Sequence, residues 1–258
     1  MPSKESISHI EGQVYFVSDS HLGVPNYTSS LEREKKLVKW LDEIKSDATH
    51  LFLLGDIFDF WFEYKKVIPK GYTRLLGKLS ELSDMGIKIY YFIGNHDMWI
   101  RDYFANEIGC TVFDSPQVFL INGKKVFVAH GDGLGPRDRG YKIMKKIFSC
   151  KFNKWIYARL HPNFAIWFGH YLSRRSRAAN AVKDEVFVGE TKEFLILFAR
   201  EKIKTEPFDY FIFGHRHLAM EFKIDETTTY INTGDWVRLF SYAKSVGDKI
   251  ELNYYKAD

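Results

Sequence analysis

The sequence predicts an α/β fold in which a parallel β-sheet is flanked by helices. Short apolar runs of strand length alternate with longer stretches whose apolar residues recur at helical spacing. In the N-terminal half the order is strand, helix, strand, helix, strand, which implies parallel strands joined by right-handed crossovers. With 258 residues the chain is long enough to bury a substantial core.

The elements follow in chain order. QVYFVSD is expected to be a buried strand, and LEREKKLVKWLDEIK places Leu37, Val38, Leu41 and Ile44 on one helix face. HLFLLGD is the second strand, YTRLLGKLSELSDMG the second helix with a glycine stop, and KIYYFIGNHD the third strand.

The second half mixes other patterns. QVFLINGKKVFVAHGD predicts a hairpin around Asn122-Gly123. YKIMKKIF, KWIYARL and TKEFLILFAREKI predict helices, FDYFIFGHRH predicts a strand, and MEFKIDETTTYINTGDW and FSYAKSVGDKIELNYY alternate like antiparallel strands. We expect one domain, 1–258, in which a basic aromatic helical insertion at about 137–185 forms the only separate subdomain.

Composition is that of an ordinary globular protein, with 45% hydrophobic and 27% charged residues. Two cysteines make no disulfide framework, which favours a reducing compartment. The polar stretch MPSKESISHIEGQ is unlike a signal peptide, and no run approaches the roughly 20 apolar residues of a membrane span. The expected location is therefore the cytoplasm.

The net charge of +4 hides a local excess of basic residues. The segment from Arg137 to Lys183 carries twelve basic residues and one acid, a net charge of +11, whereas the other 25 basic and 32 acidic residues give −7. Such a block indicates an anionic partner, which could be a phosphate, an acidic membrane surface or nucleic acid.

Five of the predicted strands end in the same kind of side chain. The ends read SDSH, GDIFD, GNHD, AHGD and GHRH, and supply Asp19, His21, Asp56, Asn95, His130, His215 and His217. In open parallel sheets ligand sites lie beyond the carboxyl ends of the strands, so these blocks should converge. A single histidine at a strand end is usually an ordinary hydrogen-bonded or exposed residue, but five coincident blocks favour a shared site.

The residue types indicate what converges. Imidazoles and carboxylates bind borderline divalent metals such as Mn, Fe, Zn or Co, and the absence of thiolates from the set disfavours a structural zinc site. Seven donors are too many for one ion and suit two. Two metals about 3.5–4 Å apart can bind a shared hydroxide and hold the oxygens of an in-line phosphoryl displacement.

This ordered set of motifs resembles the calcineurin-like metallophosphoesterase family. The resemblance implies two mixed sheets in a sandwich, flanked by helices, with two divalent ions, most often manganese, at the strand ends. It implies that Asp19, His21, Asp56 and His217 hold one ion, and that Asp56, Asn95, His130 and His215 hold the other. His96 would contact the phosphate and protonate the leaving oxygen, and Asp97 would orient it.

Several other polar residues have a structural interpretation. Asp59 and Asp132 are expected to support their loops, and NTGDWVR is expected to be a turn. His9, His50, His161 and His170 lie outside the motifs and are expected to be surface or core residues.

The insertion is the guide to the substrate. HPNFAIWFGHYLSRRSRAAN is amphipathic enough to lie on a membrane surface or to line a lipid groove, although a helical hairpin with a solvated basic face would have the same composition. The insertion is similar to that of the UDP-2,3-diacylglucosamine pyrophosphatases of lipid A synthesis, as are GDIFDFW and GDGLGPRDRGY. That resemblance implies substrate contacts from Arg137, Ser173, Arg177 and Asn180, a nucleotide-sugar lipid substrate, and peripheral binding to the inner membrane surface.

One position departs from that subfamily, which typically has Arg where this sequence has His96. A broad phosphodiesterase or nucleotidase would share every metal ligand. A nuclease would explain the basic block, although nucleic acid is the less expected partner. A non-catalytic scaffold is disfavoured because all seven ligands are present.

Overall fold

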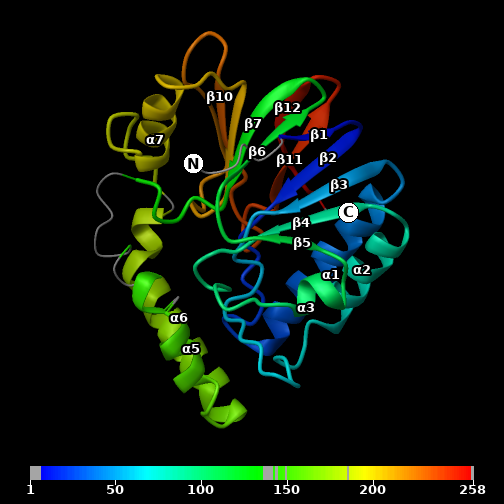
Figure 1. The fold of residues 1–258 in the computed structure, drawn as a ribbon, viewed down its shortest axis with the longest axis vertical. Coiled ribbons are helices and arrows are strands. Elements are labelled where there is room, and N and C mark those ends of the chain that lie inside the picture. Colours follow the sequence, from blue (N-terminus) through cyan, green and yellow to red (C-terminus); the bar gives the residue numbers. More distant parts are fainter. Residues whose placement is uncertain (1–6, 136–141, 143–144, 149, 185, 257–258) are drawn as a thin grey trace.

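Two six-stranded mixed β-sheets lie at the centre of the molecule (Figure 1). This computed structural model describes residues 7–135, 142, 145–148, 150–184 and 186–256, and only the backbone of Tyr27 and of residues 178–184. In spatial order, the first sheet consists of β1 (Ser8–Ile10), β6 (Gln117–Ile121), β7 (Lys124–Ala129), β8 (Tyr210–Phe213), β10 (Thr229–Asn232) and β9 (Met220–Lys223). The second sheet consists of β12 (Lys249–Tyr254), β11 (Ser241–Val246), β2 (Gln13–Val17), β3 (Ala48–Leu53), β4 (Lys88–Phe92) and β5 (Thr111–Phe113).

The predicted parallel unit is confirmed in the second sheet, where β2, β3, β4 and β5 pair in parallel. Its crossover helices are α1 (Tyr27–Ile44) and α2 (Thr73–Asp84), and the short helix α3 (Tyr103–Asn106) precedes β5. The N-cap of helix α1 is Asn26, whose side-chain oxygen accepts the backbone N–H of Ser29 at 3.1 Å. The apolar faces of α1 and α2 are buried in one cluster with the outer face of this sheet, so the predicted helical spacing corresponds to real packing.

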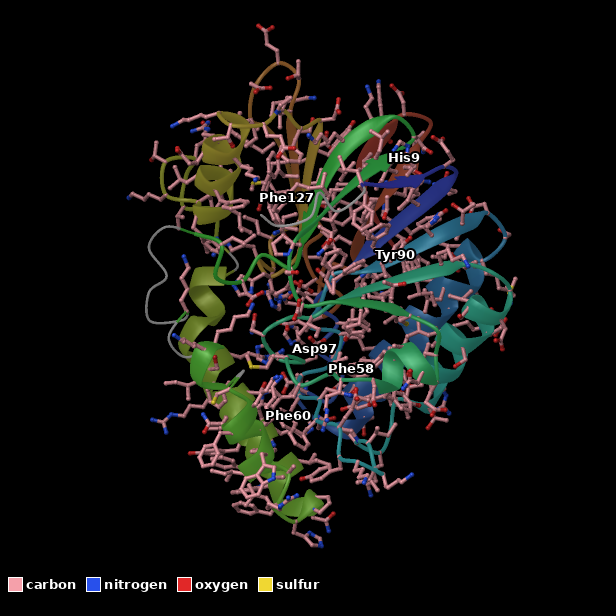
Figure 2. The ribbon with its side chains drawn as sticks, in the orientation of Figure 1. His9, Phe58, Phe60, Tyr90, Asp97 and Phe127 are labelled. Carbon is pink, nitrogen blue, oxygen red and sulfur yellow. The ribbon has the colours of Figure 1, made fainter. Side chains whose placement is uncertain are left out.

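The inner faces of the two sheets form a second apolar core. Phe52 lies 4.7 Å from Phe16 and 5.1 Å from Phe119 between ring centroids, which joins β2 and β3 to β6 of the opposite sheet. The outer face of the first sheet is covered by α7 (Phe194–Ile203), which packs over Phe127 (Figure 2). Each sheet is thus buried on both faces, which explains the continuous apolar runs in its strands.

The turn and the C-terminal strands form largely as predicted. β6 and β7 form the expected antiparallel hairpin, and Asn122 in its turn has a φ of 47°. β9 pairs antiparallel with β10, and β11 pairs antiparallel with β12. β10 also pairs in parallel with β8, a non-local contact that the alternating pattern did not indicate.

The insertion lies along one side of the sandwich as a helical hairpin of α5 (Lys151–Tyr157) and α6 (Pro162–Asp184) (Figure 1). Residues 145–148 are also helical, and the rest of the helix expected over YKIMKKIF lies partly outside the described residues. The hairpin packs on the core through an aromatic cluster built on Phe62, Trp99 and Tyr157. Gly169 lies directly against the Phe60 ring, and any Cβ at this position would collide with it. Within the residues that the structure describes, none of the helices is both long enough and apolar enough to span a bilayer.

Candidate metal centre

The carboxyl ends of five strands from both sheets bring the seven predicted metal ligands together. Among the described residues, three groups have ligand atoms within 4.8 Å of one another, and two of these consist of predicted ligands alone, namely Asp19, His21 and His217, and Asp56, His130 and His215. The third group is His21, Asp59 and His96. Asn95 joins the second group, with its Oδ1 3.2 Å from Nε2 of His130. Oδ2 of Asp56 lies 3.9 Å from Nε2 of His21 and 3.5 Å from Nε2 of His130, so this carboxylate stands between the two groups.

The backbone at this edge is held in an unfavourable conformation. Asp19, His21, Asp56 and His215 have φ values of 53°, 41°, 53° and 66°. A non-glycine residue in this region costs on the order of 1–3 kcal/mol and is held in place only by its surroundings. Here the loops hold one another, because the amide of Asp19 donates to the carbonyl of Gly55 at 3.1 Å and the amide of His21 to that of Asp56 at 3.0 Å.

The GNHD segment that follows β4, residues 94–97, packs closely against Asp56. Oδ1 of Asp56 accepts the amide of His96 at 2.8 Å, and a Cβ at Gly94 would collide with the Asp56 carboxylate. Only glycine allows this approach. Asp97, which follows His96 in the chain, lies near the centre of the molecule in Figure 2 and is fully buried.

Asp97 has partners other than the expected one. Its Oδ1 accepts the amide of Gly94 at 2.7 Å, and its Oδ2 accepts the Tyr91 hydroxyl at 2.6 Å and the amide of Ile57 at 3.1 Å. The carboxylate therefore ties the GNHD segment to the GDIFD segment and to β4, and its role in orienting His96 stays a prediction. Burial raises the pKa of Asp97 to about 6.

Two carboxylates stand behind two of the ligand histidines. His21 directs Nε2 toward Oδ1 of Asp19, at 3.6 Å, and Nδ1 toward Oδ1 of Asp59, at 3.7 Å. His217 likewise directs Nε2 toward Oδ1 of Asp19, at 3.6 Å, and Nδ1 toward Oδ2 of Asp235, at 3.8 Å. Metal-binding histidines commonly have an acidic partner on the second nitrogen, which fixes the ring and raises its basicity.

The donors fit a pair of cations. Oδ1 of Asp19 is buried and has no hydrogen-bond partner among the described residues, although two imidazole nitrogens face it. Those nitrogens, Nε2 of His21 and Nε2 of His217, are only 3.2 Å apart. A divalent ion among these three atoms would satisfy all of them. Nδ1 of His130 bonds the carbonyl of Leu54 at 2.6 Å, which leaves Nε2 for the second group.

The pKa values of the ligand histidines also support a site for two cations. Burial lowers the pKa of His21 well below its ordinary value, that of His215 to about 3 and that of His217 to about 4, so these rings are neutral near pH 7 and can donate a lone pair. Burial also opposes a proton on His130, but the adjacent Asp56 carboxylate outweighs it and raises the pKa of His130 to about 10. A cation binding between Asp56 and His130 would displace that proton.

Helix α6 reaches the centre with one face. Oγ of Ser173 is hydrogen-bonded to Nδ1 of His96 at 2.8 Å, and the carbonyl of Asp59 lies 3.1 Å from the same nitrogen. Nη1 of Arg177 lies 3.5 Å from Oδ1 of Asp59, and Nδ1 of His170 lies 3.5 Å from its Oδ2. Asp59 is fully buried and faces His21 on one side and two side chains of α6 on the other. The insertion therefore contacts the metal centre at Asp59.

The other predicted residues have different outcomes. Arg137 lies outside the described residues, and for Asn180 only the backbone is described. Asp132 forms an ion pair with Lys145, in agreement with its expected structural role. His9 and His161 are exposed, and His50 is half-buried.

Sequence reasoning missed the surroundings of two ligands. Asp235 does form the expected turn, with Oδ1 accepting the amides of Val237 and Arg238 at 2.7 and 2.6 Å, but its other oxygen faces His217. Asp235 follows the carboxyl end of β10, at the same edge as the five ligand-bearing strand ends, and this position could have indicated its role. His170 is half-buried against Asp59, and its place on the Ser173 and Arg177 face of α6 was the corresponding signal.

The chain is similar to a known protein family and to several named proteins. The family described as Calcineurin-like phosphoesterase matches residues 12–219. A UDP-2,3-diacylglucosamine hydrolase of Porphyromonas gingivalis is 36% identical, over 94% of this chain and 97% of its own. One of Aeromonas hydrophila is 27% identical, over 86% and 89%. The solved cold-active protein-tyrosine phosphatase of a Shewanella species shows 14% identity and a TM-score of 0.47, covering 97% of this chain and 80% of its own.

Proposed function

The chain belongs to the calcineurin-like phosphoesterase family and is a metal-dependent hydrolase, and we propose that its substrate is UDP-2,3-diacylglucosamine. It would hydrolyse the diphosphate to UMP and 2,3-diacylglucosamine 1-phosphate. The observation that carries the proposal is the meeting of α6 with the metal centre, where Ser173 bonds His96 and Arg177 lies against Asp59. Relatives named for this activity align over 94% and 86% of the chain.

The seven strand-end ligands would hold two divalent ions, with Asp56 shared between them. We propose manganese, with Fe, Zn or Co as ions of similar ligand preference. When bound, the ions would supply activation of water and neutralisation of phosphate charge.

His96 would act on the substrate through Nε2. Its Nδ1 is engaged by Ser173 and by the carbonyl of Asp59, so Nε2 is the nitrogen that can meet a phosphate or leaving oxygen. Arg177 would supply close by the permanent cation that the lipid subfamily typically places at this position, since Arg177 and His96 both face Oδ1 of Asp59, at 3.5 and 3.9 Å.

The insertion would receive the acyl chains and bind the cytoplasmic face of the inner membrane. Its two helices expose aromatic side chains to about half of their area or more, and these are Phe152, Trp155, Phe164, Trp167 and Tyr171. Arg174 and Arg175 are exposed on the same helix as Trp167, and the Arg159 guanidinium lies 4.6 Å from the Trp155 ring centroid. Aromatic rings beside basic side chains favour the interface of an anionic bilayer.

The test is a manganese-supported assay on UDP-2,3-diacylglucosamine in detergent, run in parallel with bis-p-nitrophenyl phosphate. We expect the lipid substrate to be cleaved with a much higher kcat/KM, and ³¹P NMR to show UMP and a sugar 1-phosphate. Cleavage of the small ester alone would reject the proposal in favour of a broad phosphodiesterase. Steeply salt-dependent DNA binding with DNA cleavage would instead indicate a nuclease.

A further inference from the structure

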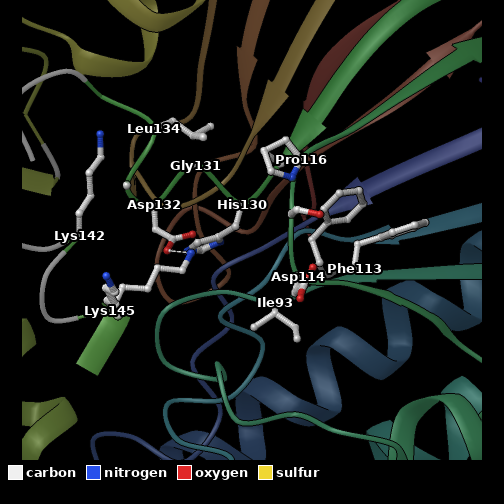
Figure 3. Close-up of a pocket in the computed structure, with 15 residues that line it drawn as sticks. Ile93, Phe113, Asp114, Pro116, His130, Gly131, Asp132, Leu134, Lys142 and Lys145 are labelled. Carbon is white, nitrogen blue, oxygen red and sulfur yellow. Dashed lines mark hydrogen bonds and ion pairs between the residues drawn. The ribbon is translucent and has the colours of Figure 1, made fainter. Parts of the chain in front are cut away.

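A cavity of about 360 Å³ opens beside the metal centre, between the carboxyl ends of β4, β5 and β7 and the lysines of residues 142–146 (Figure 3). The ligand that it shares with the centre is His130, at the end of β7, whereas α6 reaches the centre at His96 and Asp59. A substrate bound at the metals could therefore extend in two directions, one along α6 and one into this cavity.

One wall of the cavity is apolar and fixed in place. Ile93, Phe113 and Pro116 line it at the carboxyl ends of β4 and β5. Phe113 is half-buried, with its ring centroid 5.1 Å from that of Phe92 and 5.8 Å from that of Tyr90. An aromatic ring held by such packing offers a preformed surface for a flat heterocycle.

The rest of the lining is charged. Asp114 and Ser115 are exposed on the loop that follows β5, next to the apolar wall. Across the cavity stand Lys142, Lys145 and Lys146, of which Lys145 pairs with Asp132 and Lys146 is exposed. A carboxylate next to an apolar surface can accept ribose hydroxyls, and the lysines favour a phosphate.

We propose that this cavity binds the nucleoside monophosphate half of the substrate. The base would lie on Phe113 and Pro116, the ribose hydroxyls would bond Asp114, and the phosphate would point to His130 and the lysines. The sugar with its acyl chains would leave the centre on the opposite side, along α6. This inference rests on the proposed function and adds to it a division of the substrate between the two sides of the metal centre.

The test compares UMP with 2′-deoxyuridine monophosphate by calorimetry on the manganese-loaded protein. We expect UMP to bind about tenfold more tightly, because the deoxynucleotide lacks a hydroxyl that bonds a charged group. Asp114→Ala should bring the two dissociation constants together. Asp84→Ala removes an exposed carboxylate where α2 ends, at the amino end of β4, and should retain the preference. Lys146→Ala should weaken UMP severalfold while keeping the ratio of the two constants.

Equal dissociation constants in the unsubstituted protein, or a preference that Asp114→Ala leaves intact, would overturn the inference. Hydrolysis of UDP-2,3-diacylglucosamine is measured separately, so the two proposals can fail independently. Turnover without ribose discrimination rejects the subsite alone, and discrimination without turnover rejects the lipid substrate alone.

Discussion

The metal centre and the helical insertion meet at Asp59 but are built in opposite ways. The centre consists of strand ends that are buried, conformationally restricted and cross-linked by backbone hydrogen bonds. The insertion rests on an aromatic cluster at one end and turns a row of aromatic and basic side chains to solvent. The difference suggests a division of labour in which the centre fixes the chemistry and the insertion selects the substrate. Substitutions in the two regions should therefore differ in which substrate they affect.

Asp56→Ala should have the largest effect, and on every substrate. Asp56 is the carboxylate within reach of both ligand groups, so its removal should weaken both ions. Losing several kcal/mol of charge stabilisation corresponds to about 10³-fold in turnover or more. Metal content by mass spectrometry and turnover of both substrates would measure it, with Asp248→Ala in the exposed turn between β11 and β12 as control. If Asp56→Ala lowered turnover of the lipid substrate alone, the proposed division between a centre that fixes the chemistry and an insertion that selects the substrate would be contradicted.

Asp59→Asn should come next and should affect both regions. The carboxylate stands behind His21 and also faces Arg177 and His170 of α6. Loss of such a partner typically costs 10–100-fold in metal affinity or activity. Manganese titration and turnover would measure it. Asp47→Asn, which removes a carboxylate bonded by the Tyr15 hydroxyl at 3.0 Å, is the matched control. Unchanged manganese affinity would show that Asp59 only supports its loop.

Asp59 and Asp235 also mark the limit of what the sequence predicts. The seven ligands follow from one rule, because parallel strands place their carboxyl ends at one edge and side chains there must converge. The parallel order of β2, β3 and β4 follows from local periodicity in the same way. Which carboxylate stands behind which histidine depends on contacts between segments far apart in the chain, and on the way α6 packs over Phe60. No local pattern encodes those contacts, so the sequence predicts only a loop position for Asp59, a turn for Asp235 and a surface or core position for His170.

Trp167→Ser should affect the insertion alone. The side chain is 56% exposed, and burying it in a bilayer interface contributes on the order of 1–2 kcal/mol, so binding to anionic vesicles should fall about tenfold. Cosedimentation with phosphatidylglycerol vesicles measures this binding. Met85→Ser, at an apolar residue of equal exposure beyond the end of α2, is the control. Bis-p-nitrophenyl phosphate reports whether the metal centre is intact. Vesicle binding that both variants retain equally would exclude α6 as the membrane-binding surface.

Ser173→Ala should produce a smaller loss. The substitution removes a hydrogen bond to Nδ1 of His96, and a bond of this kind changes kcat by roughly three- to tenfold. Metal content and KM should stay as they were, and Ser173→Thr should restore part of kcat. Ser176→Ala, an exposed serine on the same helix, should leave kcat unchanged. If both alanine variants lose kcat equally, the loss reflects the helix as a whole and not the orientation of His96.

One cysteine lies in the core and the other in the insertion, so their rates of alkylation compare the two regions. Of the changes considered, alkylation should have the smallest effect on activity. Cys110 lies in the core beside α3, where burial raises the pKa of its thiol to about 12. Cys150 is exposed at the start of α5, where the backbone amides of Asn153 and Phe152 lower its pKa. Because the thiolate is the reactive form, iodoacetamide near pH 7.5 should modify Cys150 first and Cys110 only on unfolding. Mass spectrometry of the digested protein would follow both sites, with Cys150→Ser as control.

Anionic vesicles should slow the reaction at Cys150, two residues before the exposed Phe152, if the insertion lies on the bilayer. Alkylation of Cys110 at a similar rate in the native protein would show that the core opens as readily as the insertion, and the contrast between the two regions would fail.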